Sequence, residues 1–165
     1  MKVPIRLILA ALTATLALSC LRMEEPRYPK AGDRLPEFEV CDNNGEKVST
    51  SMLSKGKTLL VFFNTGCADC RKELPIIEDF HRDNPTVRAL AISREESAES
   101  IAAYWKSNGF SIPFSAQETR FIYNLFSNTG IPLLVLSSEG TVIKVFNQYL
   151  DESMPSKEIL DEFFQ

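Results

Sequence analysis

The sequence predicts an α/β protein in which helices flank a mixed central sheet. Apolar runs typical of buried strands alternate with stretches of helical spacing, two further apolar runs surround a short turn near the C-terminus, and an amphipathic stretch closes the chain. The 165 residues are 44% hydrophobic and 24% charged, which is enough for one domain with a substantial core. The net charge of −4 and the lack of a basic stripe argue against a nucleic-acid partner.

The N-terminus has the pattern of an export signal. Lys2 and Arg6 give it a positive start, and the apolar run over residues 7–18 is too short for a membrane span. The run ends at Ser19, directly before Cys20, as in bacterial lipoprotein signals, where the cysteine becomes the lipidated first residue. We therefore expect lipidation at Cys20; plain cleavage after Ser19 is the alternative.

These features divide the chain into three parts. We expect a lipoprotein-type signal peptide at 1–19, an extended, proline-containing tether at 20–30 and one folded domain at 31–165. The protein is then expected in the cell envelope, facing the periplasm and anchored to a membrane by its lipid. Disulfides persist outside the cytoplasm, so export favours redox chemistry for a close cysteine pair. Cys41 is left over, and we expect it to be a buried or half-buried strand residue.

The first half of the domain predicts a hairpin, a strand and a long helix. Asn44-Gly45 favours a tight turn between short strands, and a helical turn follows. The apolar run after it reads as a buried strand, and the helix beyond ends before Asn84-Pro85 with Pro75 bending it. The expected ranges are strands at 38–41 and 47–49, a helical turn at 51–53, a strand at 59–63 and a helix from the cysteine pair to about Asp83.

The second half alternates strands and helices before a closing hairpin. Ser93 or Ser97 is expected to cap one helix, which ends at Asn108-Gly109, and Thr119 to cap the next. The expected strands are 87–92, 133–136 and 142–149, with a short extended piece at 112–114 and a turn at 137–140. The expected core residues of the last two helices are Ile122, Leu125 and Phe126, then Ile159, Leu160, Phe163 and Phe164.

The chemistry centres on two cysteines where the 59–63 strand gives way to a helix. Cys67 and Cys70 are separated by two residues, so the first turn of that helix can close them into a small disulfide ring. The unpaired amides of the turn and the helix dipole favour a thiolate at Cys67, the reactive species. Cys67 would attack a substrate disulfide and Cys70, one turn deeper, would resolve the mixed disulfide. A structural disulfide or a chance pair is the alternative.

Two segments resemble the thioredoxin superfamily, and most closely its TlpA/ResA-like extracytoplasmic thiol–disulfide oxidoreductases. They are Cys67-Ala68-Asp69-Cys70-Arg71-Lys72-Glu73-Leu74-Pro75 and Thr129-Gly130-Ile131-Pro132. The resemblance implies a thioredoxin-like fold with an N-terminal β-hairpin extension. It also implies a cis Pro132 beside the cysteine pair and an Ile131 whose backbone binds an extended substrate. We assign Gly66, directly before the first cysteine, to substrate binding as well.

Glu73 is the third expected catalytic residue. In TlpA/ResA-like proteins an acid at this position tunes proton transfer at the thiols, and a partly desolvated carboxylate can accept a thiol proton. The alternative is an exposed first-turn glutamate that complements the helix dipole. The sequence departs from the family at Gly66, where a Trp is usual, and at Asp69, whose charge opposes a thiolate. If Asp69 outweighs Arg71 and Lys72, the pair becomes more reducing.

The expected function is that of an exported thiol–disulfide oxidoreductase acting on envelope proteins, chiefly as a reductant. The Cys67–Cys70 dithiol needs no further cofactor or metal, and a membrane thiol reductase would supply its electrons. One alternative is a peroxiredoxin-like peroxidase using Cys67, although Asn64 stands where such enzymes need Thr. A copper chaperone using the cysteines and His81 is a weaker alternative, because copper-delivery relatives have wider cysteine spacing and a histidine in another loop.

Overall fold

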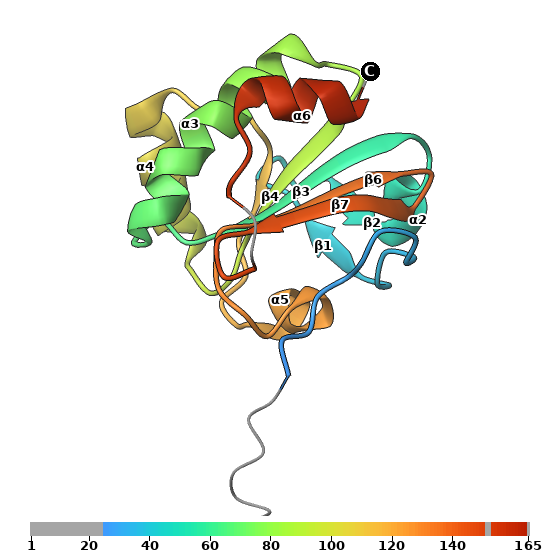
Figure 1. Ribbon diagram of the computed structural model, residues 1–165. Coiled ribbons are helices and arrows are strands. Elements are labelled where there is room, and N and C mark those ends of the chain that lie inside the picture. The colour runs from blue at the N-terminus through green and yellow to red at the C-terminus, as the bar shows by residue number, and fades with distance from the viewer. Residues whose placement is uncertain (1–24, 151–152, 165) are drawn as a thin grey trace, which may run out of the picture.

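A five-stranded sheet in the order β5-β4-β3-β6-β7 forms the centre of the computed structural model, which describes residues 25–150 and 153–164 (Figure 1). β4 is parallel to β3 and β5 is parallel to β4, whereas β6 is antiparallel to β3 and β7 is antiparallel to β6. The sheet is therefore mixed, as predicted. The strands are β3 (Lys57–Phe63), β4 (Arg88–Ser93), β5 (Phe114–Ser115), β6 (Leu133–Ser138) and β7 (Thr141–Asn147).

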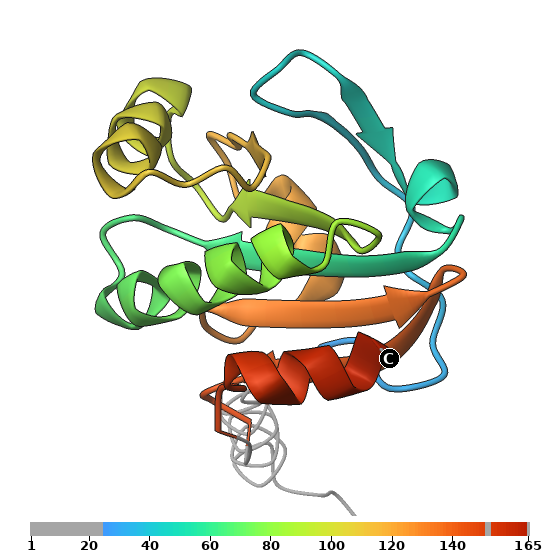
Figure 2. The same cartoon turned by 90° about the horizontal axis from the view of Figure 1, so that it is seen from above.

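Helices cover both faces of the sheet. On one side lie α3 (Ala68–Asp83), α4 (Ala98–Asn108) and α6 (Lys157–Phe164), and on the other lies the short α5 (Phe121–Phe126) (Figures 1 and 2). No helix within the described residues is long and apolar enough to cross a membrane. The expected signal peptide at 1–19 and the expected lipid site Cys20 lie outside the described residues.

Two adjacent phenylalanines of β3 anchor these layers. Successive strand residues point to opposite faces, so Phe62 and Phe63 pack against different helices. The ring centroid of Phe63 lies 5.0 Å from that of Trp105 on α4, and Phe62 lies 4.7 Å from Phe126 on α5. Both side chains are fully buried. The strand that leads to the cysteine pair is thus fixed from both sides.

A small hairpin precedes the sheet, as expected. It consists of β1 (Glu39–Cys41) and β2 (Lys47–Ser49), followed by α2 (Thr50–Leu53). Its tip lies against β5, because the Asn43 amide donates to the Phe114 carbonyl at 2.8 Å. Gly45 in the turn has φ 82°, which suits glycine.

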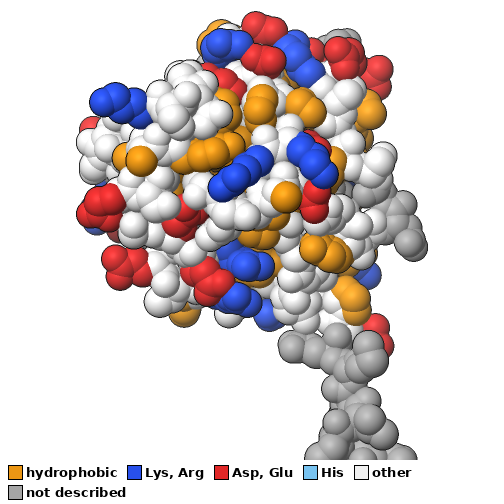
Figure 3. All heavy atoms as spheres, turned by 90° about the vertical axis from the view of Figure 1, so that its left-hand side faces the viewer, with side chains coloured by type: hydrophobic (Ala, Val, Ile, Leu, Met, Phe, Trp, Pro, Cys, Tyr) orange, Lys and Arg blue, Asp and Glu red, His pale blue; other side chains and the backbone are white. Residues whose placement is uncertain are grey.

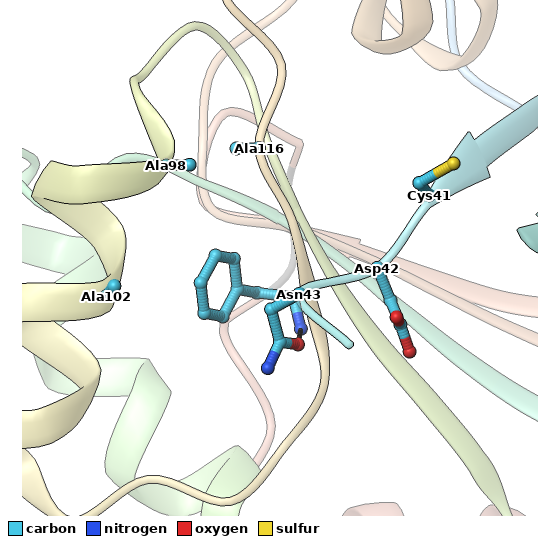
Figure 4. A pocket seen from close by; sticks show the side chains of 7 residues that line it. Cys41, Asp42, Asn43, Ala98, Ala102 and Ala116 are labelled. Atoms are coloured by element: carbon cyan, nitrogen blue, oxygen red, sulfur yellow. Dashed lines mark hydrogen bonds between the residues drawn. The ribbon is translucent and has the colours of Figure 1, made fainter. Parts of the chain in front are cut away.

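Cys41 is exposed, so the expectation of a buried or half-buried residue is wrong. The hairpin packs only one face on the domain, and alternation along β1 directs Val40 inward and Cys41 outward. Cys41 borders a hollow of about 350 Å³ between the hairpin and α4. Figure 4 shows its sulfur directed away from Ala98 and Ala102 on the opposite wall.

Of the two serines expected as possible caps of α4, Ser97 is the cap and accepts from the Ser100 amide, so this expectation is confirmed. The helices differ from expectation in three other places. α5 begins at Phe121 after Arg120, so Thr119 is not its cap residue. Leu125 on α5 is 37% exposed and Ile159 on α6 is 40% exposed, because each short helix buries a narrower face than predicted. That face is Ile122, Tyr123 and Phe126 on α5, and Leu160 and Phe164 on α6.

The part of the tether that the structure describes is pinned to the loop after α5. The Arg27 amide donates to the Asn128 side-chain oxygen at 2.7 Å, and the Asn128 amide donates back to the Arg27 carbonyl at 3.2 Å. The Asn128 side-chain nitrogen also donates to the Glu25 carbonyl at 3.1 Å. Residues 25–27 therefore follow the domain surface beside this loop.

Candidate active site

Cys67 occupies the N-cap position of α3, directly after the loop that leaves β3. Its Sγ accepts a hydrogen bond from the Cys70 amide at 3.4 Å and lies 3.6 Å from the Ile131 carbonyl oxygen, to which the thiol can donate. Cys67 is half-buried, whereas Cys70 is fully buried, and both are free thiols. One sulfur is thus within reach of a partner, and the second lies beneath it.

Burial raises the pKa of the Cys70 thiol well above its ordinary value. A hydrogen bond with Cys67 raises it further, while the Asn64 backbone and the charge of Arg94 act in the opposite direction. A raised pKa keeps Cys70 protonated at neutral pH. Cys67, in contrast, accepts the amide hydrogen bond at the N-terminus of α3. The two sulfurs therefore differ in setting, with Cys70 a buried thiol and Cys67 reachable at the helix tip.

The loop before Cys67 is braced by the segment between β4 and α4. The buried Thr65 donates its amide to Glu96 Oε2 at 2.8 Å, and its hydroxyl also bonds to that carboxylate. The Asn64 side chain donates to the Glu95 carbonyl at 3.1 Å and accepts from the Gly66 amide at 2.8 Å. The approach to the helix is therefore fixed before the first cysteine is reached.

The Ile131–Pro132 bond is cis, as the resemblance implied. It brings the Ile131 carbonyl beside Cys67, although the two residues are 64 positions apart. The preceding Gly130 carbonyl is held by the Tyr123 hydroxyl at 3.1 Å and the Asn147 side chain at 2.6 Å. The start of β6 is thus fixed against the N-terminus of α3.

A groove opens at the reachable sulfur. Its hollow of about 380 Å³ is lined by Asn64, Gly66, Cys67, Arg94, Gly130, Ile131 and Tyr149. Three of the expected site residues therefore share one surface, and Pro132 is buried behind it. Hydrophobic, basic and acidic side chains are interspersed on the side of the molecule that carries α3 and α4 (Figure 3).

Arg94 and Tyr149 line this groove but were not singled out by the sequence. Arg94 follows β4 directly, and the carboxyl ends of neighbouring parallel strands meet at one edge of a sheet. That rule could have placed Arg94 near Cys67. Tyr149 has no comparable signal, because it lies in the irregular chain after β7. Its ring lies so close to Gly130 that a Cβ there would come within 1.9 Å of it.

Glu73 lies three residues after Cys70, on the same side of α3. Burial raises the pKa of its carboxyl group, the charge of Asp69 raises it further, and Lys72 partly opposes both. Its Oε2 atom is buried and has no hydrogen-bond partner among the described residues. Glu73 is therefore not a fully exposed first-turn glutamate, and its carboxylate can take up a proton readily.

Asp69 forms an ion pair with a neighbouring lysine. Its carboxylate accepts from Lys72 Nζ at 2.8 Å, and this bond, helped by one from Gln148, lowers the pKa of Asp69. Asp69 is therefore ionised at neutral pH, but the Lys72 charge offsets its field at Cys67. The negative charge of Asp69 and the positive charge of Lys72 thus oppose each other within one turn of α3, as expected.

His81 lies near the far end of α3, where its Nδ1 is buried without a hydrogen-bond partner among the described residues. The neighbouring Glu78 is buried and accepts from Ser111 Oγ at 2.6 Å and the Ile112 amide at 2.9 Å. Within the part of the chain that the structure describes, no three His, Cys, Asp or Glu side chains gather to hold a metal ion. His81 is thus not brought to the cysteine pair.

A mixed sheet, a dithiol at the start of a helix and a cis proline beside the outer sulfur define a thioredoxin-like thiol–disulfide oxidoreductase. The chain belongs to the AhpC/TSA family, whose sequence pattern matches residues 31–144. The predicted fold, the TlpA/ResA-like resemblance and the predicted class of enzyme are confirmed by these findings and by the similarities below.

Known proteins share most of this domain. The thiol-disulfide oxidoreductase ResA of Bacillus subtilis strain 168 is 28% identical over 126 residues, which cover 74% of this chain and 70% of that protein. A solved candidate protein disulfide isomerase from Bacteroides thetaiotaomicron is 28% identical with a TM-score of 0.70, covering 86% of this chain and 90% of that one. Peroxidoxin BcpB of Mycobacterium tuberculosis, 18% identical with a TM-score of 0.66 over 83% and 95% of the two chains, shares the fold.

Proposed function

We propose that this protein is an exported oxidoreductase that reduces disulfides in envelope proteins through Cys67 and Cys70. The observation that carries the proposal is the asymmetry of the pair. Cys67 is reachable and accepts a hydrogen bond from the Cys70 amide at the helix tip, whereas the Cys70 thiol is buried and has a raised pKa. The Cys67 sulfur is suited to attack the substrate disulfide, and the Cys70 sulfur is suited to resolve the mixed disulfide that forms.

The reaction transfers two electrons. The Cys67 thiolate attacks one sulfur of the substrate disulfide, a Cys67–substrate bond forms, and the substrate S–S bond breaks to release a first thiol. Cys70 then loses its proton and attacks the Cys67 sulfur, which releases the second substrate thiol and leaves a Cys67–Cys70 disulfide. Glu73 is the proposed acceptor of the Cys70 proton, because its partly buried carboxylate has a raised pKa.

The substrate would lie in the groove as an extended segment. Gly66 leaves room directly before Cys67, and Ile131 presents its backbone at the start of β6, where Pro132 holds the turn. Backbone groups recognise any extended chain, so this part of the site binds without regard to side-chain sequence. The assignment of Gly66, Ile131 and Pro132 to substrate binding rests on this arrangement.

The setting of the reaction follows from the N-terminal sequence and from the likeness to ResA. Cys20 would carry the lipid, residues 20–30 would tether the domain, and the active site would face the periplasm. A membrane thiol reductase would return electrons to the Cys67–Cys70 disulfide, so the dithiol itself is the only redox group required. The net charge of −4 argues against a nucleic-acid partner.

Trapping the intermediate tests this proposal. Cys70→Ser should accumulate a mixed disulfide with a disulfide-containing protein such as insulin, because nothing resolves it. Cys67→Ser should form none, and Cys41→Ser, which changes an exposed thiol outside the groove, should reduce insulin like the wild type. Mixed disulfides are counted by non-reducing electrophoresis and mass spectrometry. Trapping at Cys41, or none in Cys70→Ser, would contradict the proposal.

A thiol peroxidase is the second candidate, favoured by the AhpC/TSA match itself. Two features weaken it. Asn64 stands three residues before Cys67, and the nearby Thr65 hydroxyl is bound to Glu96. Rapid peroxide consumption with slow insulin reduction would favour the peroxidase; the reverse supports the reductase.

A further inference from the structure

Arg94 is a cation with unused hydrogen-bonding capacity at the mouth of the active site. Its Nη2 lies 3.5 Å from Glu95 Oε1, a carboxylate already held by Arg120, whose hydrogen bond lowers the pKa of Glu95. The Nε of Arg94 is buried and has no hydrogen-bond partner in the described part of the chain. A guanidinium carries five N–H donors, so several remain for another acceptor.

The surroundings of Arg94 extend the groove away from Cys67. A second hollow of about 480 Å³ shares Arg94, Gly130 and Tyr149 with the first and continues to Pro26, Asn128 and Thr129. Arg94 therefore borders both hollows, between the reactive sulfur and the loop after α5. A chain that enters at Cys67 and continues along the second hollow passes this guanidinium.

We propose that Arg94 selects disulfides of polypeptide segments that carry an acidic side chain about one to three residues from the reacting cysteine. The inference rests on the proposed function and names its substrate class. A carboxylate is the acceptor that matches a guanidinium in charge and shape, and Glu95 meets Arg94 only through an oxygen that it shares with Arg120. In this proposal the backbone at Ile131 positions the substrate segment, and Arg94 binds one acidic side chain of it.

The proposed occupant is a disulfide-bearing polypeptide and not a small disulfide. The two hollows together reach from Gly66 to Pro26 and Asn128, so they offer contacts along an extended chain. The Tyr149 ring, 64% exposed, forms a wall common to both. Oxidised glutathione also bears carboxylates but is shorter than an extended polypeptide segment. The comparison of both substrates distinguishes them.

The test uses pre-reduced mature protein and symmetric peptide dimers joined by one disulfide. Three peptides differ at one position near the cysteine, which holds Glu, Gln or Lys. Each turnover converts one peptide disulfide into two peptide thiols while Cys67 and Cys70 form a disulfide. We expect the Glu peptide to react about tenfold faster than the Lys peptide at low salt, with a smaller ratio at high salt.

Variants of two arginines on β4 or next to it give the decisive comparison. Arg94→Gln should bring the Glu-to-Lys ratio close to one, and Arg94→Glu should invert it. Arg88→Gln, at the other end of β4, should keep the wild-type ratio, since Arg88 contacts the Met52 carbonyl away from the groove. Arg94→Lys keeps the charge and should retain part of the preference, which guards against a loss caused by misfolding.

Each unfavourable outcome has a distinct meaning. Equal rates for the three peptides with wild-type protein, or an unchanged ratio in Arg94→Gln, would overturn the role of Arg94 while leaving the reductase intact. Faster reduction of oxidised glutathione than of every peptide would overturn the polypeptide occupant. Absence of thiol release from all substrates, including the neutral peptide, would instead contradict the proposed function.

Discussion

The Cys70 amide donates a hydrogen bond to the Sγ of Cys67 across 3.4 Å. The sulfur thereby takes the place that a Ser or Asp oxygen takes at most helix N-termini, where unpaired amides need an acceptor. The second cysteine of the pair thus stabilises charge on the first through its backbone, while its own thiol remains buried. The proposed order of reaction, Cys67 first and Cys70 second, rests on this arrangement within one helical turn.

The buried thiol of Cys70 predicts a loss of stability at alkaline pH. Its folded pKa is raised, so the unfolded chain releases this proton above about pH 8.5 while the folded protein keeps it. The free energy of unfolding of the reduced protein should therefore fall as pH rises, with a slope of up to ~1.4 kcal/mol per pH unit from this group. Urea unfolding across this range measures it.

Cys70→Ala provides the comparison for this slope. The variant loses packing in the core, so it should be less stable throughout, but its free energy of unfolding should fall less steeply with pH. Cys41→Ser should retain the wild-type slope, because Cys41 is exposed. Equal slopes in wild type and Cys70→Ala would mean that the Cys70 pKa is not raised.

Glu73→Gln should stabilise the protein at neutral pH and slow disulfide exchange. Because the pKa of Glu73 is raised in the folded protein, its charged carboxylate lowers the free energy of unfolding. The contribution of Glu73 to that free energy is full below about pH 4.3 and is lost as pH rises through the folded pKa. Gln avoids that cost but accepts no proton from Cys70. Denaturation at two pH values and stopped-flow insulin reduction check both effects. Glu162→Gln, on an exposed site of α6, should change neither.

Asp69→Asn should raise the reduction potential of the pair by less than about 30 mV. Removal of a negative charge near Cys67 favours the thiolate and hence the reduced form, but Lys72 already offsets that charge. The double variant with Lys72→Met should return the potential toward the wild-type value. Equilibration with glutathione gives these potentials. An unchanged potential in Asp69→Asn would dismiss any influence of Asp69 on the pair.

Glu96→Ala should loosen the loop that leads to Cys67. The carboxylate accepts from the amide and hydroxyl of the buried Thr65 and from Ser100 Oγ at 2.6 Å. Loss of these bonds leaves the Thr65 amide unsatisfied, at a cost of about 1–3 kcal/mol. Urea unfolding measures the loss, and insulin reduction should slow in parallel. Glu99→Ala, exposed in the first turn of α4, serves as the control and should show neither change.

Long periodic segments made most of the fold predictable. β3 is apolar along nearly its whole length and α3 follows at once, so the strand, the helix and the cysteine pair were readable from adjacent residues. The prediction that Cys41 is buried or half-buried was wrong because a three-residue strand does not reveal which of its faces is packed. The prediction that Leu125 and Ile159 face the core was wrong because short helices bury only some of their apolar residues.

The far side of the groove was less predictable because its residues are distant in sequence. The cis proline was found through its motif, whereas Arg94 reaches the site only because β4 lies parallel to β3. Tyr149 depends on how the chain turns after β7, which no local pattern specifies. The role of Glu96 in holding Thr65 arises from tertiary contact between residues 31 positions apart, which no local pattern indicates.

The bonds between Asn128 and the segment at Glu25 and Arg27 set a distance limit for the active site. Asn128 lines the second hollow, which adjoins the one at Cys67, and Glu25 is the fifth residue after Cys20. Fully stretched, these five steps span about 17 Å. If Cys20 carries the lipid, the reactive sulfur is held close above the bilayer, and proteins whose disulfides lie near the membrane surface would meet it first.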